Sequence, residues 1–337
     1  MSQSVPILEN IQVEVLDANS YTITVEGQEL HALKCQIRSY DRETFDPTRF
    51  NQAVSPGLEQ ILLGAALDDP LNLLLRRIPV TIEQISLLRG YCAFLWQVQK
   101  IATKRTMWKS LAFAPEVARH ILNYFDVTFN PGLLLSHEQR VTRRTSIEAE
   151  IQQALRGVSD ITHDRILRAL VGLVRNSIRS NFHTNPRALA IKIAAQKVEF
   201  MPHPRPLFEI FVFSPRIEET HLRSAKVSRG GIRWSERIDD YRSEVLGLMK
   251  TQRVKNVIIV PSGAKGGFIV KNLPTSPETI PAAVETGYRE YITALLSIAD
   301  NKVGDTVVPP RDCVVLDEPD PYFVVAADKG TATFSDV

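Results

Sequence analysis

The chain has 337 residues, of which 44% are hydrophobic and 23% are charged, and its formal net charge at pH 7 is +2. A chain of this length and apolar content can bury a sizeable core and form two or three domains. The nearly neutral charge argues against a nucleic-acid-binding protein, which usually carries a strong basic bias. Residues 216–255 hold ten Lys or Arg against six Asp or Glu, and this local excess of four fits a small anionic metabolite.

The three cysteines, Cys35, Cys92 and Cys313, lie far apart and without C-x-x-C or His-rich spacing. They predict neither a disulfide framework nor a zinc site, so we expect no bound metal. The first residues lack a signal-peptide pattern, and no window approaches about eighteen uninterrupted apolar residues. We therefore expect a cytoplasmic protein that does not contact a membrane.

The N-terminal segment predicts β-strands. Residues 11–16 and 21–25 alternate apolar and polar side chains, and residues 17–20 (Asp-Ala-Asn-Ser) between them have turn chemistry. Residues 31–37 continue the strand pattern. A sheet this small needs a partner layer to be stable.

The middle of the chain predicts helices. Apolar residues recur at helical spacing between residues 47 and 125, with a capping-box signature at Thr81 and a proline-led helix start at Pro115. A single long helix is then expected over residues 146–182.

The C-terminal half alternates strands and helices, which predicts an α/β layered structure. We expect strands at residues 207–213, 257–260, 313–316 and 322–326, and helices at residues 239–250 and 283–299.

Two cations framed by glycines give the clearest chemical signal. Residues 228–235 read Ser-Arg-Gly-Gly-Ile-Arg-Trp-Ser, and residues 261–268 read Pro-Ser-Gly-Ala-Lys-Gly-Gly-Phe. Glycine pairs let backbone and ligand approach closely, and an amine shielded among them can be used for chemistry. Arg229, Lys265 and the intervening Lys250 therefore predict a site for a small molecule with more than one negative charge.

These segments closely resemble the large bacterial NAD-specific glutamate dehydrogenases. The resemblance is carried by residues 164–168, 207–216, 226–237, 244–252, 254–268 and 320–336, the last reading Asp-Pro-Tyr-Phe-Val-Val-Ala-Ala-Asp-Lys-Gly-Thr-Ala-Thr-Phe-Ser-Asp. It implies an NAD-dependent oxidative deamination of L-glutamate to 2-oxoglutarate and ammonia. Several long motifs in the same order make this signal far more specific than one short pattern.

The resemblance implies that Lys265 and Asp328 are catalytic. In the family, the matching lysine helps activate the water that attacks an iminium carbon, and the matching aspartate moves protons between amine, water and solvent. By its residues alone, Lys265 could instead be a surface lysine in a glycine turn or part of a phosphate-binding loop, although the spacing G-x-x-x-x-G-K-[ST] is absent. Asp328 could instead cap the following turn.

The same resemblance implies how the substrate is bound. Lys250 matches the lysine that holds the α-carboxylate, and Arg229 beside Gly230 and Gly231 would hold the distal carboxylate. The smaller glutamate dehydrogenases have lysine before this glycine pair, which leaves Lys226 as the alternative for that role. Each of these cations could also form an exposed ion pair.

No G-x-G-x-x-G motif follows a predicted strand, so we expect NAD to bind to a domain outside this chain. The resemblance implies a partial ACT-like regulatory segment at residues 1–42, a helical region at 43–136, and a substrate-binding lobe of the glutamate dehydrogenase type at 137–337 without the Rossmann lobe. We expect the isolated chain to be inactive and the full-length protein to be a homo-oligomer. The alternatives are a non-catalytic dicarboxylate-binding or regulatory remnant and an interaction module whose missing lobe lies on a second chain.

Overall fold

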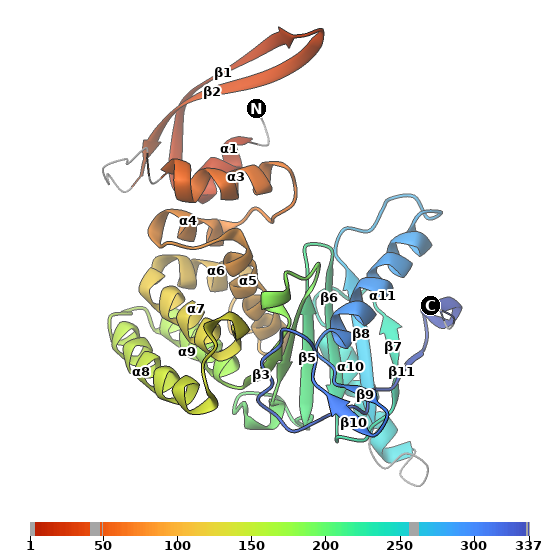
Figure 1. Cartoon of the computed structure of the whole chain (residues 1–337). Helices are drawn as coiled ribbons and strands as arrows, with labels where there is room; N and C mark the ends of the chain where they lie inside the picture. Colours follow the sequence, from red (N-terminus) through yellow and green to blue (C-terminus); the bar gives the residue numbers. More distant parts are fainter. Residues whose placement is uncertain (1–3, 41–47, 49, 256–262, 335, 337) are drawn as a thin grey trace. The chain divides into compact units, whose positions relative to one another are not determined.

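The computed structural model describes residues 4–40, 48, 50–255, 263–334 and 336 (Figure 1). The chain forms two compact units, which are described separately below. One unit contains Met1–Arg89 and Arg105–Arg119, and the other contains Gly90–Lys104 and His120–Val337. Helices α5 (Ile82–Val98) and α7 (Pro115–Phe129) contribute residues to both units.

The first unit combines one β-hairpin with short helices. Besides α5 and α7, its described residues include α1 (Ser4–Asn10), a π-helical turn (Phe50–Val54), α3 (Ser55–Leu62), a 3-10 turn (Pro70–Leu73), α4 (Leu74–Arg77) and α6 (Lys104–Phe113). A buried ion pair holds this region together, because Arg89 Nε donates to Asp69 Oδ2 at 2.6 Å. The other oxygen of Asp69 caps the 3-10 turn by accepting from the Leu71 amide at 2.9 Å.

The hairpin corrects the predicted position of the first turn. Strands β1 (Val13–Val25) and β2 (Gln28–Ser39) pair antiparallel along their whole length, and the turn lies at Glu26 and Gly27. These two residues have φ values of 50° and 79°, the left-handed pair that a two-residue hairpin requires. The predicted turn at residues 17–20 is wrong because that backbone stays extended and pairs with β2, with one irregularity beside it.

The long helix predicted over residues 146–182 is two helices and a strand. Helix α8 (His137–Arg156) ends at Gly157, and α9 (Ile161–Arg175) begins after Asp160, whose side chain accepts from the His163 amide at 2.8 Å. This N-cap starts a new helix because it satisfies a donor that the first turn leaves free. The chain then enters the first strand of the main sheet.

The second unit is built on a seven-stranded mixed sheet with the order β11-β7-β8-β6-β5-β4-β3. The strands are β3 (Ser177–Ser180), β4 (Leu189–Ile193), β5 (Phe208–Phe213), β6 (Ile217–Arg223), β7 (Gly230–Trp234), β8 (Ala264–Val270) and β11 (Val325–Ala327). Neighbours from β3 to β8 run antiparallel, whereas β8, β7 and β11 run parallel to one another.

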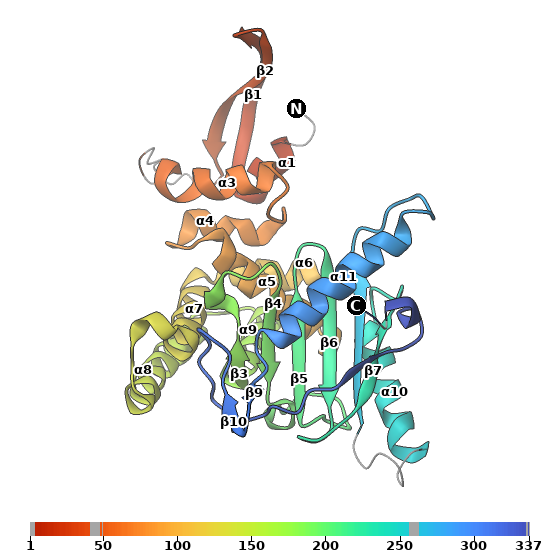
Figure 2. The ribbon, with the colours of Figure 1, turned by 45° about the vertical axis from the view of Figure 1, so that its right-hand side comes forward.

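Helices α10 (Tyr241–Lys255) and α11 (Ile280–Leu296) pack on opposite faces of this sheet (Figures 1 and 2). Successive residues of β8 show the arrangement. A side chain at Gly266 would meet Tyr291 of α11, whereas one at Gly267 would meet Val245 of α10. Because successive Cβ positions of a strand point to opposite faces, the two helices cover different sides.

The predicted elements of the C-terminal half are confirmed in part. The strand expected at 207–213 is β5, which begins at Phe208, and the helices expected at 239–250 and 283–299 are α10 and α11 with shifted ends. The strand expected at 313–316 is wrong, since that segment is irregular, and the one expected at 322–326 shortens to β11. The strand expected at 257–260 lies outside the described residues.

Five of the seven strands of the main sheet, β3, β4, β6, β7 and β8, were not predicted. Several short elements were missed as well. They are the hairpin β9 (Asn301–Val303) and β10 (Thr306–Val308), and 3-10 turns at Pro131–Leu133, Phe182–Thr184, Ala195–Lys197 and Ala332–Phe334. The sheet with helices on both faces nevertheless confirms the mixed α/β class with a helical region.

Candidate active site

Lys265 lies near the start of β8, between the parallel strand β7 and the antiparallel strand β6. It is on the face of the sheet covered by α10, where its register partner Leu222 packs with Val245 and Met249. Only 7% of Lys265 is exposed, so its ammonium group is largely shielded from water. Lys265 Nζ donates a hydrogen bond to Asp328 Oδ2, and the two side chains form an ion pair.

Asp328 follows directly after β11, the strand beside β7. Burial alone would raise the pKa of Asp328, but hydrogen bonds from Lys265 Nζ and from the Lys329 amide hold that pKa below its usual value. The Asp328 side chain is 28% exposed, so one side of the pair remains open to solvent. This carboxylate is therefore ionised at neutral pH and accessible to a substrate or a water molecule.

A buried threonine fixes the turn that carries Asp328. Thr331 is fully buried, and its Oγ1 accepts from the Asp328 amide at 2.9 Å and donates to the Ile232 carbonyl of β7 at 2.8 Å. The Thr331 amide also donates to the Asp328 carbonyl at 2.9 Å. This turn is tied to β7 and holds the carboxylate in reach of β8.

The glycines of the two motifs permit close backbone packing. A Cβ at Gly230 would lie 1.4 Å from the carbonyl oxygen of Ala264, and one at Gly231 would lie 2.8 Å from Asp328 Cβ. A Cβ at Gly266 would lie 2.7 Å from the Tyr291 hydroxyl. The glycines beside Lys265 thus make room for neighbouring elements of the protein itself, in addition to any role at a ligand.

The three cations expected to bind substrate carboxylates lie at the surface. Lys250 is exposed on α10, and Arg229 is exposed just before β7, where its Nε donates to the Tyr322 hydroxyl at 2.7 Å. Lys226 pairs with the exposed Glu318 at 2.6 Å. Within the described ranges, none of the three makes a hydrogen bond or ion pair with Lys265 or Asp328.

A buried network of charged side chains contacts the segment upstream of Asp328. The sequence patterns did not predict this network. Its members are three cations on β3, β4 and β6, one carboxylate just before β9 and two carboxylates in the segment before β11: Arg179, Lys192, Arg223, Asp300, Asp317 and Asp320. Asp320 is the centre, because it accepts from Lys192 Nζ at 2.9 Å and from Arg223 Nη1 at 2.5 Å. The acidic residues Asp317, Glu318 and Asp320, which end at the first residue of the motif 320–336, were the available signal.

The network positions the chain upstream of Asp328. Arg223 Nη2 also donates to the Tyr322 carbonyl at 2.9 Å, which fixes the backbone a few residues before β11. On the other side of the site, Arg233 Nη1 lies 3.2 Å from Glu244 Oε1 of α10, and its charge adds to the lowering of the Asp328 pKa. Ionic contacts therefore fix the segment before β11 and join β7 to α10, the elements next to the Lys265–Asp328 pair.

Among the described residues, no three or more His, Cys, Asp or Glu side chains are grouped so that they could hold a metal ion. None of the helices in that part of the chain is both long and apolar enough to cross a membrane. Cys35, Cys92 and Cys313 form no disulfide with one another.

Comparison with known families places this site in context. The family model of the bacterial NAD-glutamate dehydrogenase catalytic domain matches residues 150–337, more than half of the chain. The chain belongs to this family. A second model, glutamate dehydrogenase helical motif 3, matches residues 66–131, so members of the glutamate dehydrogenase group resemble the helical part as well.

Individual relatives are similar along the whole chain. The NAD-specific glutamate dehydrogenase of Pseudomonas aeruginosa is 37% identical over 346 aligned residues, which cover 100% of this chain and 21% of the relative. The enzymes of the same name from Mycobacterium tuberculosis and Halomonas elongata are 36% and 34% identical, and the chain covers 22% and 21% of them. The chain thus spans about a fifth of the length of these curated relatives.

Proposed function

We propose that this chain supplies the substrate site of an NAD-dependent glutamate dehydrogenase, which converts L-glutamate and water to 2-oxoglutarate and ammonia. The observation that carries the proposal is the Lys265–Asp328 ion pair, formed by residues from two family motifs and shielded on one side only. Membership of the bacterial NAD-glutamate dehydrogenase family supports the same reaction. A cytoplasmic location agrees with a metabolic reaction of this kind.

Lys265 and Asp328 would act on the iminium formed once the α-carbon of glutamate has lost its hydride. Water attacks the iminium carbon and must lose a proton, and the Asp328 carboxylate can accept it directly or through Lys265. The resulting carbinolamine then expels ammonia, and the ion pair can return that proton to the departing nitrogen. The positive charge of Lys265 would also stabilise the oxygen of the carbinolamine.

The substrate carboxylates would be bound by the surface cations. We assign the α-carboxylate to Lys250 and the distal carboxylate to Arg229, with Lys226 as the alternative for the second role. Arg229 is favoured because a guanidinium can grip a carboxylate with two hydrogen bonds, whereas Lys226 is already paired with Glu318. Gly230 and Gly231 would contact the substrate through their backbone.

NAD is the proposed hydride acceptor, as the names of the relatives indicate. The sequence contains no G-x-G-x-x-G motif, so the residues of this chain do not fit the pyrophosphate of a dinucleotide in the usual way. The roles assigned here to Lys265 and Asp328 involve only the substrate.

We further propose the domain division expected from the sequence: an ACT-like regulatory segment at residues 1–42, a helical region at 43–136 and the substrate-binding lobe at 137–337. The hairpin supports the first part, because several apolar side chains such as Tyr21 (50% exposed) and Leu30 (52% exposed) are uncovered in the described chain. An ACT-like layer would cover them.

Replacement of Lys265 in the full-length protein that contains this chain tests the catalytic role. Lys265→Ala should lower kcat for glutamate oxidation by about 100- to 10,000-fold, the usual contribution of a positioned acid–base group. Lys302→Ala, which removes an exposed lysine from β9, is the matched control and should leave kcat unchanged. Activity of Lys265→Ala within a few-fold of the parent, with unchanged thermal unfolding, would refute the assignment. Binding of 2-oxoglutarate by a parent protein without turnover would favour the non-catalytic alternative.

The carboxylate assignments predict different ligand preferences. Lys250→Ala should weaken 2-oxoglutarate and the monocarboxylic acid 2-oxobutyrate alike, because both have an α-carboxylate. Arg229→Ala should weaken only 2-oxoglutarate, by about 10- to 150-fold, the equivalent of one charged hydrogen-bonded contact. Inhibition constants for the two acids check this, and unchanged discrimination in Arg229→Ala would transfer the distal role to Lys226 or another residue.

A further inference from the structure

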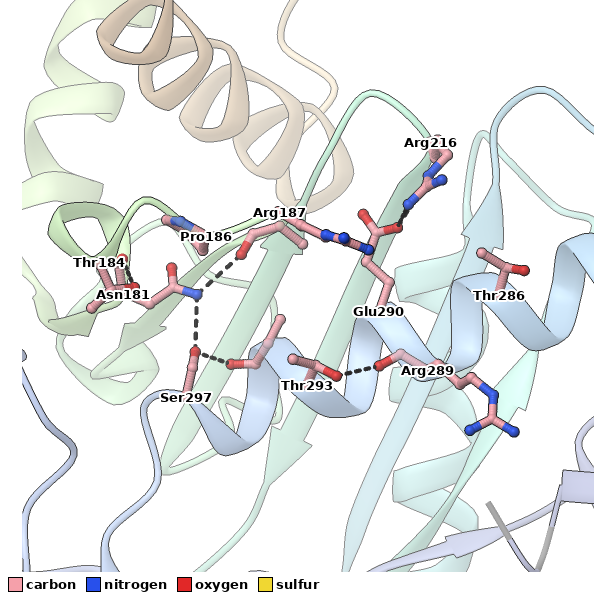
Figure 3. A pocket seen from close by; sticks show the side chains of 12 residues that line it. Asn181, Thr184, Pro186, Arg187, Arg216, Thr286, Arg289, Glu290, Thr293 and Ser297 are labelled. Carbon is pink, nitrogen blue, oxygen red and sulfur yellow. Dashed lines mark hydrogen bonds and ion pairs between the residues drawn. The ribbon is translucent and has the colours of Figure 1, made fainter. Parts of the chain in front are cut away.

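A pocket in the same unit lies away from the Lys265–Asp328 pair. It has a volume of about 530 Å³ and is formed by the segment after β3, the β5–β6 turn and one side of α11 (Figure 3). Pockets for small ligands usually measure about 300–1,000 Å³. The residues that carry its chemistry are Asn181, Arg187, Arg216, Arg289, Glu290 and Ser297.

The walls of this pocket are fixed by buried hydrogen bonds. Asn181 is fully buried, and its Nδ2 donates to the Ala188 carbonyl at 3.0 Å and to Ser297 Oγ of the α11 C-terminal end at 2.9 Å. Its Oδ1 accepts from the Ala190 amide of β4 at 2.7 Å. The loop from β3 to β4 is therefore tied to both the sheet and α11, and a ligand would find this wall already formed.

The second wall is held by an ion pair. Arg216 Nη2 donates to Glu290 Oε2 at 2.6 Å, and its Nε donates to the same oxygen at 3.1 Å. The Glu290 side chain is only 6% exposed, whereas Arg216 is 59% exposed. The guanidinium thus keeps a fixed position while part of it still faces solvent.

The pocket carries a positive excess. Its lining contains three arginines and one carboxylate, a formal excess of two positive charges. Arg187 has no hydrogen-bond or ion-pair partner among the residues that the structure describes, and Figure 3 shows it reaching toward Glu290 from the wall opposite Arg216. Arg289 pairs with Glu285 at 2.8 Å. Arg187 and Arg216 are the two guanidinium groups best placed to receive a ligand.

We propose that this pocket binds a small metabolite that carries two anionic groups, carboxylates or phosphates, one held by Arg187 and the other by Arg216. The planar guanidinium fork matches both groups and forms strong charge-assisted hydrogen bonds with them. The hydroxyl of Thr293 donates to a helix carbonyl, so its oxygen remains as an acceptor for a donor on the same ligand.

This site is separate from the proposed catalytic site. Lys265 faces the side of the sheet covered by α10, whereas the pocket lies against α11 on the other face. The two sites share no residue, so the anion site and the dehydrogenase function can fail independently.

Calorimetric titration of the full-length protein with malonate and with pyrophosphate tests the proposal. Each probe has two anionic groups, and the comparison distinguishes a carboxylate ligand from a phosphate ligand. Saturable binding of at least one probe is expected, and Arg187→Ala and Arg216→Ala should each weaken it by about 10- to 150-fold. Arg168→Ala removes an exposed arginine paired with Asp164 on α9 and is the matched control, which should bind as the parent does.

Arg187→Ala is the decisive variant because this exposed side chain has no partner to lose within the described residues, so folding should be unaffected. Thermal unfolding of the variant checks this point. Absence of saturable binding for both probes would overturn the proposal. Binding that is equally strong in a folded Arg187→Ala protein would overturn it as well, since the anion would then be held elsewhere.

Discussion

His221 is a buried histidine on β6 whose two ring nitrogens have no hydrogen-bond partner in the described part of the chain. It is 1% exposed, and its ring lies 5.0 Å from that of Phe323. Burial, with a smaller contribution from the charge of Arg223, lowers the pKa of His221 from 6.5 to about 3. The folded protein therefore keeps this side chain neutral over most of the acidic range.

Replacement of His221 should make the protein less sensitive to acid. Below pH 6.5 the unfolded chain binds a proton at His221 that the folded chain does not bind until about pH 3, so stability is lost as the pH falls. The free energy of unfolding should thus decrease by up to about 1.4 kcal/mol per pH unit from this residue alone. His221→Phe should remove that slope, and urea unfolding at about pH 7 and about pH 5 measures it. His31→Phe on the exposed hairpin is the control, and equal pH slopes in all three proteins would contradict the prediction.

At the scale of single elements, the close spacing of strands β7 and β8 depends on Gly230. Gly230→Ala places a Cβ 1.4 Å from the Ala264 carbonyl oxygen, which neither backbone can avoid without separating the strands. We expect a loss of more than about 3 kcal/mol in the free energy of unfolding. Gly247→Ala in α10 is the matched control, because nothing lies within 4 Å of the added Cβ. It should raise the free energy of unfolding by about 0.5–1 kcal/mol. Chemical denaturation distinguishes the two, and a stable Gly230→Ala protein would show that the strands tolerate a wider spacing.

The docking of the segment before β11 depends on its buried ion pairs. Asp320→Ala leaves Lys192 and Arg223 buried without their shared carboxylate and should cost about 3–5 kcal/mol of unfolding free energy. Glu318→Ala, two residues away, removes only an exposed partner of Lys226 and should leave the unfolding midpoint nearly unchanged. Similar midpoints for both variants would show that the network is not needed for docking of this segment.

The apolar strand β5 was predicted from its sequence, whereas the polar strand β6 was not. The pattern Phe-Glu-Ile-Phe-Val-Phe identified β5, whereas β6 reads Ile-Glu-Glu-Thr-His-Leu-Arg and is nevertheless buried along its whole length. Some of its polar side chains find partners far along the chain, such as Asp320 for Arg223 at 2.5 Å. Local sequence contains no information about such partners, so a buried polar strand resembles a surface segment.

At the scale of the whole molecule, family motifs identified the residues of the candidate site but not their arrangement. Lys265 and Asp328 were both expected to be catalytic, and the structure places them in contact although 63 positions separate them. This contact depends on the order β11-β7-β8, in which parallel neighbours come from remote segments. Strand order of this kind is decided by the packing of the complete unit, which periodicity does not report.

The separation of the two site residues also governs when the site can exist during synthesis. Lys265 leaves the ribosome 63 residues before Asp328, an interval of roughly 3–13 s at about 5–20 residues per second. The delay between synthesis of the two partners is longer in the buried charge network, since Arg179 and its partner Asp317 are 138 residues apart. During that interval the growing chain contains cations that are buried in the finished fold but do not yet have their carboxylate partners. The nascent sheet therefore stays incomplete until the segment containing Asp317, Asp320 and Asp328 has been added.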